Sequence, residues 1–481
     1  MWTAPGPVLG VAGCVAASLL GDGSLYVVLP VVFASRGLTP WHVGLILSAN
    51  RWVRLFTNDP VARLLGIAPI RTTLSTALVV GGVTSIMYGV TTSVTLLVIS
   101  RCLWGACWSV IRLAGLLVVT DCVDMGLATE DSIGQTTGIS AGLSRVGSAL
   151  GMALGGVVCD LLGFDVLFIL AGMLTCLAAP FSFQCAFGSL PRVSVTAARR
   201  LQKRATSTAS SSCGAFELST VRCRLFALAF AASCAGNGMI VSTLGAVLAS
   251  HSNTDGVSGR TYLDLGIAHF DTASFNGVLL GTRWALEGFG APFYGRLVDS
   301  YGWRTVAPAA FALSAANGCI GWLLLRTAES AGVDASGALL MAVLVIVVIF
   351  FFLVSAADLC VKAMGVTWRE APLLVQGNDL GAAVGPVLGY ALLQMGLPAS
   401  SVLAAQSIIH AAAALVAVAM ANAEHSPSSS SQSTNGKEGP CMALTEADEA
   451  DEVAGQCQAD EEAAKISTGS KETQKETRNL V

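Results

Sequence analysis

The sequence predicts an all-α membrane protein with twelve transmembrane helices in two six-helix bundles. Three observations predict this class. The chain of 481 residues is 53% hydrophobic and only 12% charged, whereas soluble domains are about 25% charged. Its 51 glycines suit membrane helices, in which small residues let backbones approach closely. Twelve apolar stretches of roughly 20 residues, the length that spans a bilayer, follow one another. These features exclude a soluble enzyme, a disordered protein and a nucleic-acid binder.

The twelve stretches form two groups of six. The first predicts a bundle over residues 1–185, with helices at 8–30, 41–57, 72–91, 95–118, 136–158 and 166–185. A basic, serine-rich segment over 186–223 is expected to be a flexible linker, with a regulatory or lipid-binding role as the alternative. The second bundle, 224–421, is predicted to contain helices at 224–250, 273–294, 305–325, 337–358, 373–395 and 400–421. The acidic tail, 422–481, has too few large apolar residues to fold and is expected to be disordered.

The Lys and Arg residues between the helices predict the orientation, because basic loops stay in the cytosol. With a cytosolic N-terminus, the outer loops contain three bases, Arg36, Arg260 and Arg326. The inner loops then contain thirteen, namely Arg63, Arg71, Arg192, Arg199, Arg200, Lys203, Arg204, Arg222, Arg224, Arg296, Arg304, Lys362 and Arg369. Both termini are therefore predicted to be cytosolic. The N-terminus has no basic segment before its apolar run, so the first helix is expected to remain as an anchor.

Two segments of the first half recur in the second half. Arg51-Trp52 followed by Pro60 matches Arg283-Trp284 followed by Pro292, 232 residues later. Glycines at four-residue spacing recur 234 residues apart, as Gly147, Gly151 and Gly155 and again as Gly381, Gly385 and Gly389. This agreement indicates a duplicated six-helix unit. Both copies run in the same direction, which relates the halves by an axis along the membrane normal and favours a site between them near the midplane.

Beyond this repeat, the chain resembles the major facilitator superfamily over about residues 8–421. The segment GRLVDSYGWR, 295–304, resembles the loop between helices 8 and 9 of that family, and LVISRCLWGACWS, 97–109, resembles its fourth-helix motif at Arg101 and Gly105. The glycine-rich helices 5 and 11 resemble a motif of antiporters, although only helix 11 has the proline, as Gly385-Pro386. The resemblance implies alternating access, in which the two halves tilt around a central site.

The 295–304 segment is predicted to be a gating loop formed by Gly295, Asp299, Gly302 and Arg304. Gly295 is expected to allow a tight turn and Gly302 a positive φ before the next helix. Asp299 can accept hydrogen bonds from the N-terminus of a neighbouring helix. In the equivalent first-half segment, 58–71, Gly66 stands in place of the aspartate, so the second-half copy is expected to contribute more to the gate.

Ionisable residues inside the predicted helices are the candidate pathway residues, because they are costly in lipid and normally face a cavity or a partner. There are more bases than acids among them, which favours an anionic substrate. They are Asp22, Arg51, Arg54, Arg101, Arg112, Arg145, Arg283, Glu287 and Asp379.

Two ion pairs between the halves follow from the depths of these residues and from the family's packing of helix 5 on helix 8 and helix 2 on helix 11. The predicted pairs are Arg145–Glu287 and Arg51–Asp379. Arg145–Glu287 is expected to close the cytosolic end when the site faces outward. The alternative is that each arginine is satisfied by carbonyl groups of its own half.

Three further residues are candidates for the pathway. Asp22 has no base near it in sequence and is a candidate proton carrier, with a structural role as the alternative. Asn237, between Gly236 and Gly238, predicts a polar break in helix 7. Trp104 lies one turn from Trp108 on helix 4 and could line an apolar wall, although such residues often serve only in packing.

Together these features predict a secondary transporter that moves a small organic solute by proton-coupled, efflux-like antiport. The alternatives are a uniporter or symporter for organic anions and a transport-dead receptor or scaffold. We expect no enzymatic activity and no cofactor. No metal site is expected, because the 14 cysteines form no cluster at ligand spacing, and ATP-driven transport is not expected, because no phosphate-binding GxxxxGK[ST] loop occurs. The expected partners are the lipid bilayer, the solute and protons. A monomer is predicted, in the plasma membrane or an organelle membrane.

Overall fold

The computed structural model describes residues 5–124, 127, 133–183, 215–254, 261–265, 268–330, 333–367 and 371–423. Most of the predicted linker, 186–223, and nearly all of the predicted tail, 422–481, lie outside these ranges. The side chains of a few residues within them, including Asp299, also lie outside the description. Residues 1–425 form one compact unit, to which the following description applies.

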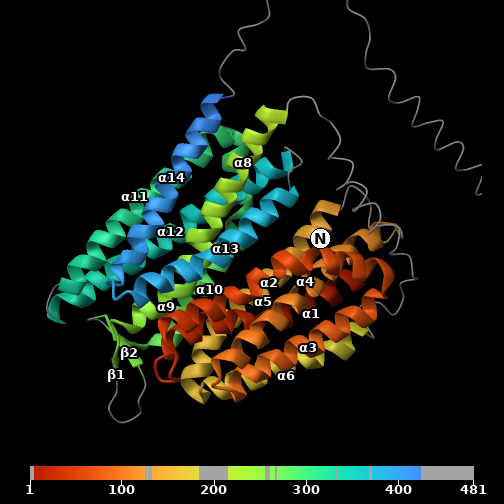
Figure 1. Ribbon diagram of the computed structural model, residues 1–481, viewed down its shortest axis with the longest axis horizontal. Helices are drawn as coiled ribbons and strands as arrows, with labels where there is room; N and C mark the ends of the chain where they lie inside the picture. Colours follow the sequence, from red (N-terminus) through yellow and green to blue (C-terminus); the bar gives the residue numbers. More distant parts are fainter. Residues whose placement is uncertain are drawn as a thin grey trace, which may run out of the picture. The chain divides into compact units, whose positions relative to one another are not determined.

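Six helices form the first bundle (Figure 1). Each predicted span overlaps one of them, and several helices continue beyond the predicted end because polar residues extend them past the apolar window. The helices are α1 (Gly6–Val32), α2 (Pro40–Ile67), α3 (Ile70–Val90), α4 (Val94–Asp124), α5 (Ile133–Leu162) and α6 (Phe164–Phe181).

The second bundle also contains six helical spans, when the segment from residue 215 to 249 is counted as one. This span begins at Ala215, nine residues before the predicted boundary at 224. Its polar break is present, since a π-helical segment at 233–240 contains Gly236, Asn237 and Gly238. The elements are α8 (Ala215–Ala232), η3 (Ser233–Ile240), α9 (Val241–Ala249), α10 (Thr272–Tyr301), α11 (Trp303–Ser330), α12 (Val333–Thr367), α13 (Ala371–Gln394) and α14 (Ser400–Ala423).

The sequence did not predict the small antiparallel sheet that connects α9 to α10. Its strands β1 (Asn253–Thr254), β2 (Thr261–Asp264) and β3 (His269–Asp271) pair in the order β1-β2-β3. Tyr262 stands opposite both Asn253 and Asp271. The strands are too short for a detectable alternation of apolar residues. The described part of the protein is therefore all-α apart from this sheet, which lies at the end opposite to the start of α1 (Figure 1).

The repeated glycines allow equivalent close packing in both halves. In α5, a Cβ atom placed on Gly147 or Gly151 would lie 2.5 Å from backbone atoms of Ala16 or Leu20 in α1. In α13, Gly381 and Gly385 lie against the backbone of α8 and η3 in the same way. The fifth helix of each half therefore packs on the first helix of that half, as expected for a duplicated unit.

Substituting Gly151 with alanine should lower the free energy of unfolding by about 1–3 kcal/mol, because the new methyl group would push α1 and α5 apart. Gly142→Ala in the same helix is the control, since nothing lies within 4 Å of a Cβ at that position. Thermal unfolding in detergent measures both variants. Equal stability of the two variants would contradict the packing described here.

Nine helical spans among the described residues are long and apolar enough to cross a membrane. The three helices that fail this test are α2, α10 and α13, which contain Arg51, Arg54, Arg283, Glu287 and Asp379. Charged side chains at membrane depth face a cavity or a partner rather than lipid. The most polar helices are therefore expected to meet at the interface between the halves.

Candidate functional site

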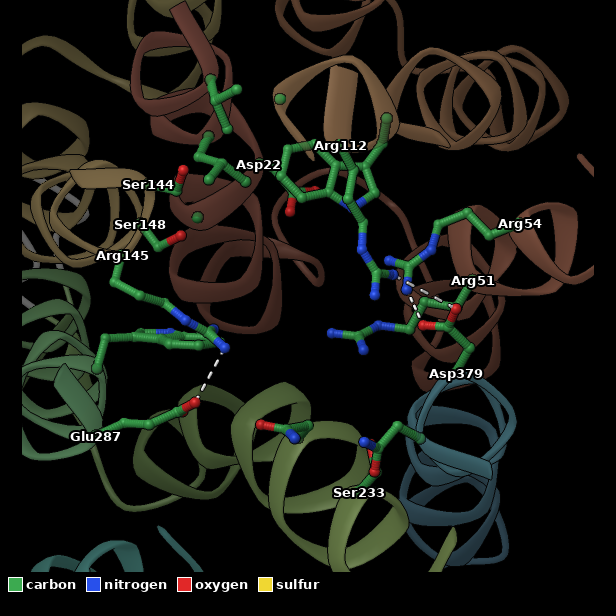
Figure 2. A pocket seen from close by; sticks show the side chains of 18 of the residues that line it. Asp22, Arg51, Arg54, Arg112, Ser144, Arg145, Ser148, Ser233, Glu287 and Asp379 are labelled. Carbon is green, nitrogen blue, oxygen red and sulfur yellow. Dashed lines mark hydrogen bonds and ion pairs between the residues drawn. The ribbon is translucent and has the colours of Figure 1, made fainter. Parts of the chain in front are cut away.

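A cavity of about 430 Å³ lies between the two bundles. The most extensive contacts across the interface join α5 to α10 and α2 to α13, as expected from the family resemblance, and α1 also contacts α9 and α10. The lining residues come from α1, α2, α4 and α5 on one side and from η3, α9, α10, α12 and α13 on the other. Figure 2 shows their charged side chains pointing into this space from both bundles.

The cavity extends from the middle of the helices toward the end at which α1 begins, which we call the terminal end. Its walls there include Val119, Ser140 and Lys362. At the opposite end the bundles are in direct contact. Asn276 Nδ2 donates a hydrogen bond to the Val27 carbonyl at 2.8 Å, and the Ser274 backbone N–H donates to Asp160 Oδ2 at 2.7 Å. If the terminal end is cytosolic, as the basic loops predict, this arrangement is inward-facing.

Arg145 and Glu287 form the predicted ion pair between α5 and α10. Arg145 Nη2 lies 2.9 Å from Glu287 Oε1, and its guanidinium lies 4.4 Å from the centre of the Trp284 ring. The pair forms in an arrangement whose cavity extends toward the terminal end, and both residues lie near mid-helix rather than at the rim. If the terminal end is cytosolic, the pair is present while that end is open. That the pair closes the cytosolic end in the outward-facing state stays a prediction.

Asp379 pairs with Arg54 and not with the predicted partner Arg51. Arg54 donates a short hydrogen bond to Asp379 Oδ1, and Arg112 Nη1 lies 3.8 Å from Oδ2. Arg54 is nearer the terminal end of α2, at a depth closer to that of Asp379 in α13. Arg51 instead donates from Nε to the Tyr26 hydroxyl at 3.3 Å. Figure 2 shows Arg51, Arg54 and Arg112 turned toward the part of the cavity next to Asp379.

Asp22 has a basic partner that is distant in sequence. Arg101 Nη1 in α4 lies 2.5 Å from Asp22 Oδ1, and the Arg101 side chain is fully buried. Its guanidinium also lies 5.3 Å from the ring centres of Tyr26 and Trp104. The fourth-helix motif thus provides the counter-ion of the helix 1 acid, and Asp22 is not an isolated carboxylate.

Asn237 lines the cavity and contacts Arg283, which lies behind it. Arg283 is 1% exposed and donates a short hydrogen bond from Nη2 to Asn237 Oδ1.

Trp104 is buried and stacks on Trp108 with ring centres 5.6 Å apart. Trp108 lines the cavity whereas Trp104 does not, so the apolar wall comes from Trp108 and Trp104 supports it.

Sequence reasoning missed Asp358 and Lys362 as cavity residues. Lys362 Nζ lies 2.5 Å from Asp358 Oδ2 and 3.5 Å from Glu287 Oε1. The tenth helix was predicted to end at 358, so Lys362 was assigned to an inner loop. Their i, i+4 spacing was the available signal, because such residues face each other on a helix.

The gating segment is helical over most of its length. Gly295 lies inside α10, which ends at Tyr301, so the predicted tight turn at Gly295 is wrong. Gly302 has φ +74° and ends the helix, as predicted. Arg304 lies with its guanidinium 5.9 Å from the centre of the Trp303 ring. The predicted contact of Asp299 lies outside the described side chains.

The described residues contain no group of three or more His, Cys, Asp or Glu side chains that could hold a metal ion. The site consists of charged, polar, aromatic and apolar side chains between two bundles. Such a site, between two bundles of long helices, is typical of a multi-pass membrane transporter.

Comparison with known proteins identifies the family. A family model described as the Major Facilitator Superfamily matches residues 11–371, and the chain belongs to this superfamily. The nucleoside transporter NupG has a similar structure, with a TM-score of 0.62 and 12% identity over 86% of this chain and 99% of that chain. A bacterial homologue of the human lysosomal transporter Spinster, solved in an inward-facing and occupied conformation, has a TM-score of 0.60 and 14% identity over 86% of this chain and 94% of its own. No curated protein matches the chain.

Proposed function

We propose that this protein is a secondary transporter that moves a small organic solute by alternating access, in exchange for protons. The observation that supports this proposal is the cavity between the two bundles, which is sealed by direct contacts at one end. Its volume lies within the usual range of about 300–1,000 Å³ for sites that bind small molecules. The nucleoside transporter NupG, which has the same fold, agrees with a small organic solute.

Glu287 is the best-placed proton carrier for this exchange. It contacts Arg145 from the first bundle and Lys362 from the second. Protonating its carboxylate would weaken attractions to both bundles at once, so proton binding would be coupled to their relative movement. Asp22 is the second candidate, but its partner Arg101 belongs to the same bundle. We therefore assign proton coupling to Glu287.

Glu287→Gln should abolish solute flux driven by a pH gradient and retain exchange of solute for solute, because exchange needs no net proton movement. A thermal-shift screen of a compound library identifies the solute, and flux is then measured with purified protein in liposomes. Asp165→Asn, which changes a largely exposed carboxylate outside the cavity, is the matched control and should retain pH-driven flux. If Glu287→Gln still responds to the pH gradient, Glu287 is not the carrier. Binding without any flux would instead identify a receptor.

A further inference from the structure

Each of the four carboxylates that line the cavity has a basic partner of its own. The pairs are Asp22–Arg101, Glu287–Arg145, Asp358–Lys362 and Asp379–Arg54. Three of these pairs have N–O distances of 2.9 Å or less, and the fourth is the short hydrogen bond between Arg54 and Asp379. Within the described part of the chain, no cavity carboxylate is therefore left to attract a cationic solute.

Two arginines of the cavity wall remain after this pairing, Arg51 and Arg112. Among the described side chains no carboxylate lies within 4.0 Å of Arg51, whose printed hydrogen bond goes to the Tyr26 hydroxyl. Arg112 lies 3.8 Å from Asp379, a carboxylate that is already engaged by Arg54, and its side chain is 40% exposed. Figure 2 shows both guanidinium groups on the side of the cavity next to Asp379. This region thus has an excess of two positive charges.

We propose that the cavity binds an organic anion whose carboxylate or phosphoryl group is held by Arg51 and Arg112. An unmatched charge is costly in a partly enclosed site, and planar guanidinium groups match both kinds of oxyanion with two parallel hydrogen bonds. The bound anion would provide the missing negative charge. This inference rests on the proposed transport function and names the substrate class of the same site.

The rest of the cavity indicates that the anion has an apolar or aromatic body. Trp108 presents its ring to the cavity and is held by stacking on Trp104. Val15, Leu19 and Met152 line the same space. An anion with a planar ring could therefore place its charged group between Arg51 and Arg112 and its ring against Trp108.

The proposal is tested with four small probes that share a benzene ring and differ in charge. They are benzoate, phenyl phosphate, benzyl alcohol and benzylamine, and their binding to the purified full-length protein in detergent is measured by calorimetry and thermal shift. Phenyl phosphate should bind most tightly, because a phosphate monoester has a charge of about −1.5 to −2 at pH 7 and two cations are unmatched. Benzoate should bind more weakly, and the alcohol and amine should not bind.

Arg51→Gln and Arg112→Gln should each weaken phenyl phosphate binding by about 10- to 100-fold, as expected for the loss of a hydrogen bond to a charged group. Arg51→Lys should recover part of this loss, since it keeps the charge without the planar fork. Arg326→Gln, an exposed arginine at the end of α11, is the matched control and should bind normally.

Three results would overturn the anion proposal: equal binding of the neutral or cationic probe, unchanged anion binding in both variants, or no binding of either anion up to about 10 mM. These outcomes are independent of the transport function. A neutral solute that is transported would disprove the anion site and leave the transporter intact. Anion binding that depends on Arg51 and Arg112, without any flux, would support the anion site and contradict the proposed transport function.

Discussion

Replacing Asp379 with alanine should lower the free energy of unfolding by about 3–5 kcal/mol and abolish most transport, because removing one partner of a buried ion pair leaves the other charge uncompensated. The Asp379 and Arg54 side chains are only 7% and 10% exposed. Arg51 and Arg112 line the same cavity and add to the repulsion.

The double variant Arg54→Met with Asp379→Leu should be more stable than Asp379→Ala, because replacing both partners of a buried pair by apolar residues is often neutral or stabilising. The double variant removes one positive and one negative charge, so the excess of two positive charges at Arg51 and Arg112 remains. Its transport should remain low, since the link between α2 and α13 is lost. Denaturant unfolding in detergent and flux in liposomes measure the two effects. A double variant that is no more stable than Asp379→Ala would contradict this interpretation of the pair.

The helices and their order could be predicted from the sequence because nine of the described spans contain a long apolar window, and the three more polar ones, α2, α10 and α13, occupy the intervals between them. The glycine repeat predicted the duplicated unit, and the structure gives a reason for the glycines, since only glycine permits the backbone contacts seen at Gly147 and Gly151. The sheet could not be predicted, because strands of two to four residues contain too few positions for a pattern.

The positions of the charged residues along their helices could be predicted from the sequence. The direction in which each side chain faces around its helix could not. Counting residues from the helix ends placed Arg145 opposite Glu287 correctly. The same count could not distinguish Arg51 from Arg54, which differ by about 60° around α2 and by ~4.5 Å along it. Which of the two reaches Asp379 depends on the rotation of α2 against α13, and that is set by packing such as the contact of Gly44 with Tyr390.

A second large effect is expected at the Arg145–Glu287 pair. Arg145→Glu and Glu287→Arg should each reduce solute exchange at least tenfold, since each places like charges together across the two bundles. The double swap should recover part of the loss, because it restores the attraction. Recovery should be incomplete, since an arginine at position 287 would also lie next to Lys362. An interaction energy of about 0.5–3 kcal/mol in this double-mutant cycle is typical of residues in contact.

The pair should also bias the conformation of the protein. It forms in the arrangement in which the ends opposite to the termini are closed, so breaking it should reduce the population of that arrangement. Ser144→Cys, which places a thiol on the cavity wall, should then react more slowly with a maleimide when Glu287 is replaced by alanine, as measured by peptide mass spectrometry. Asp165→Ala is the matched control, because it removes an ion pair of 2.7 Å with Arg36 inside the first bundle. An unchanged rate of labelling at position 144 in the Glu287→Ala background would show that the pair persists in both conformations. Arg145 and Glu287 would then act as a fixed link about which the bundles turn.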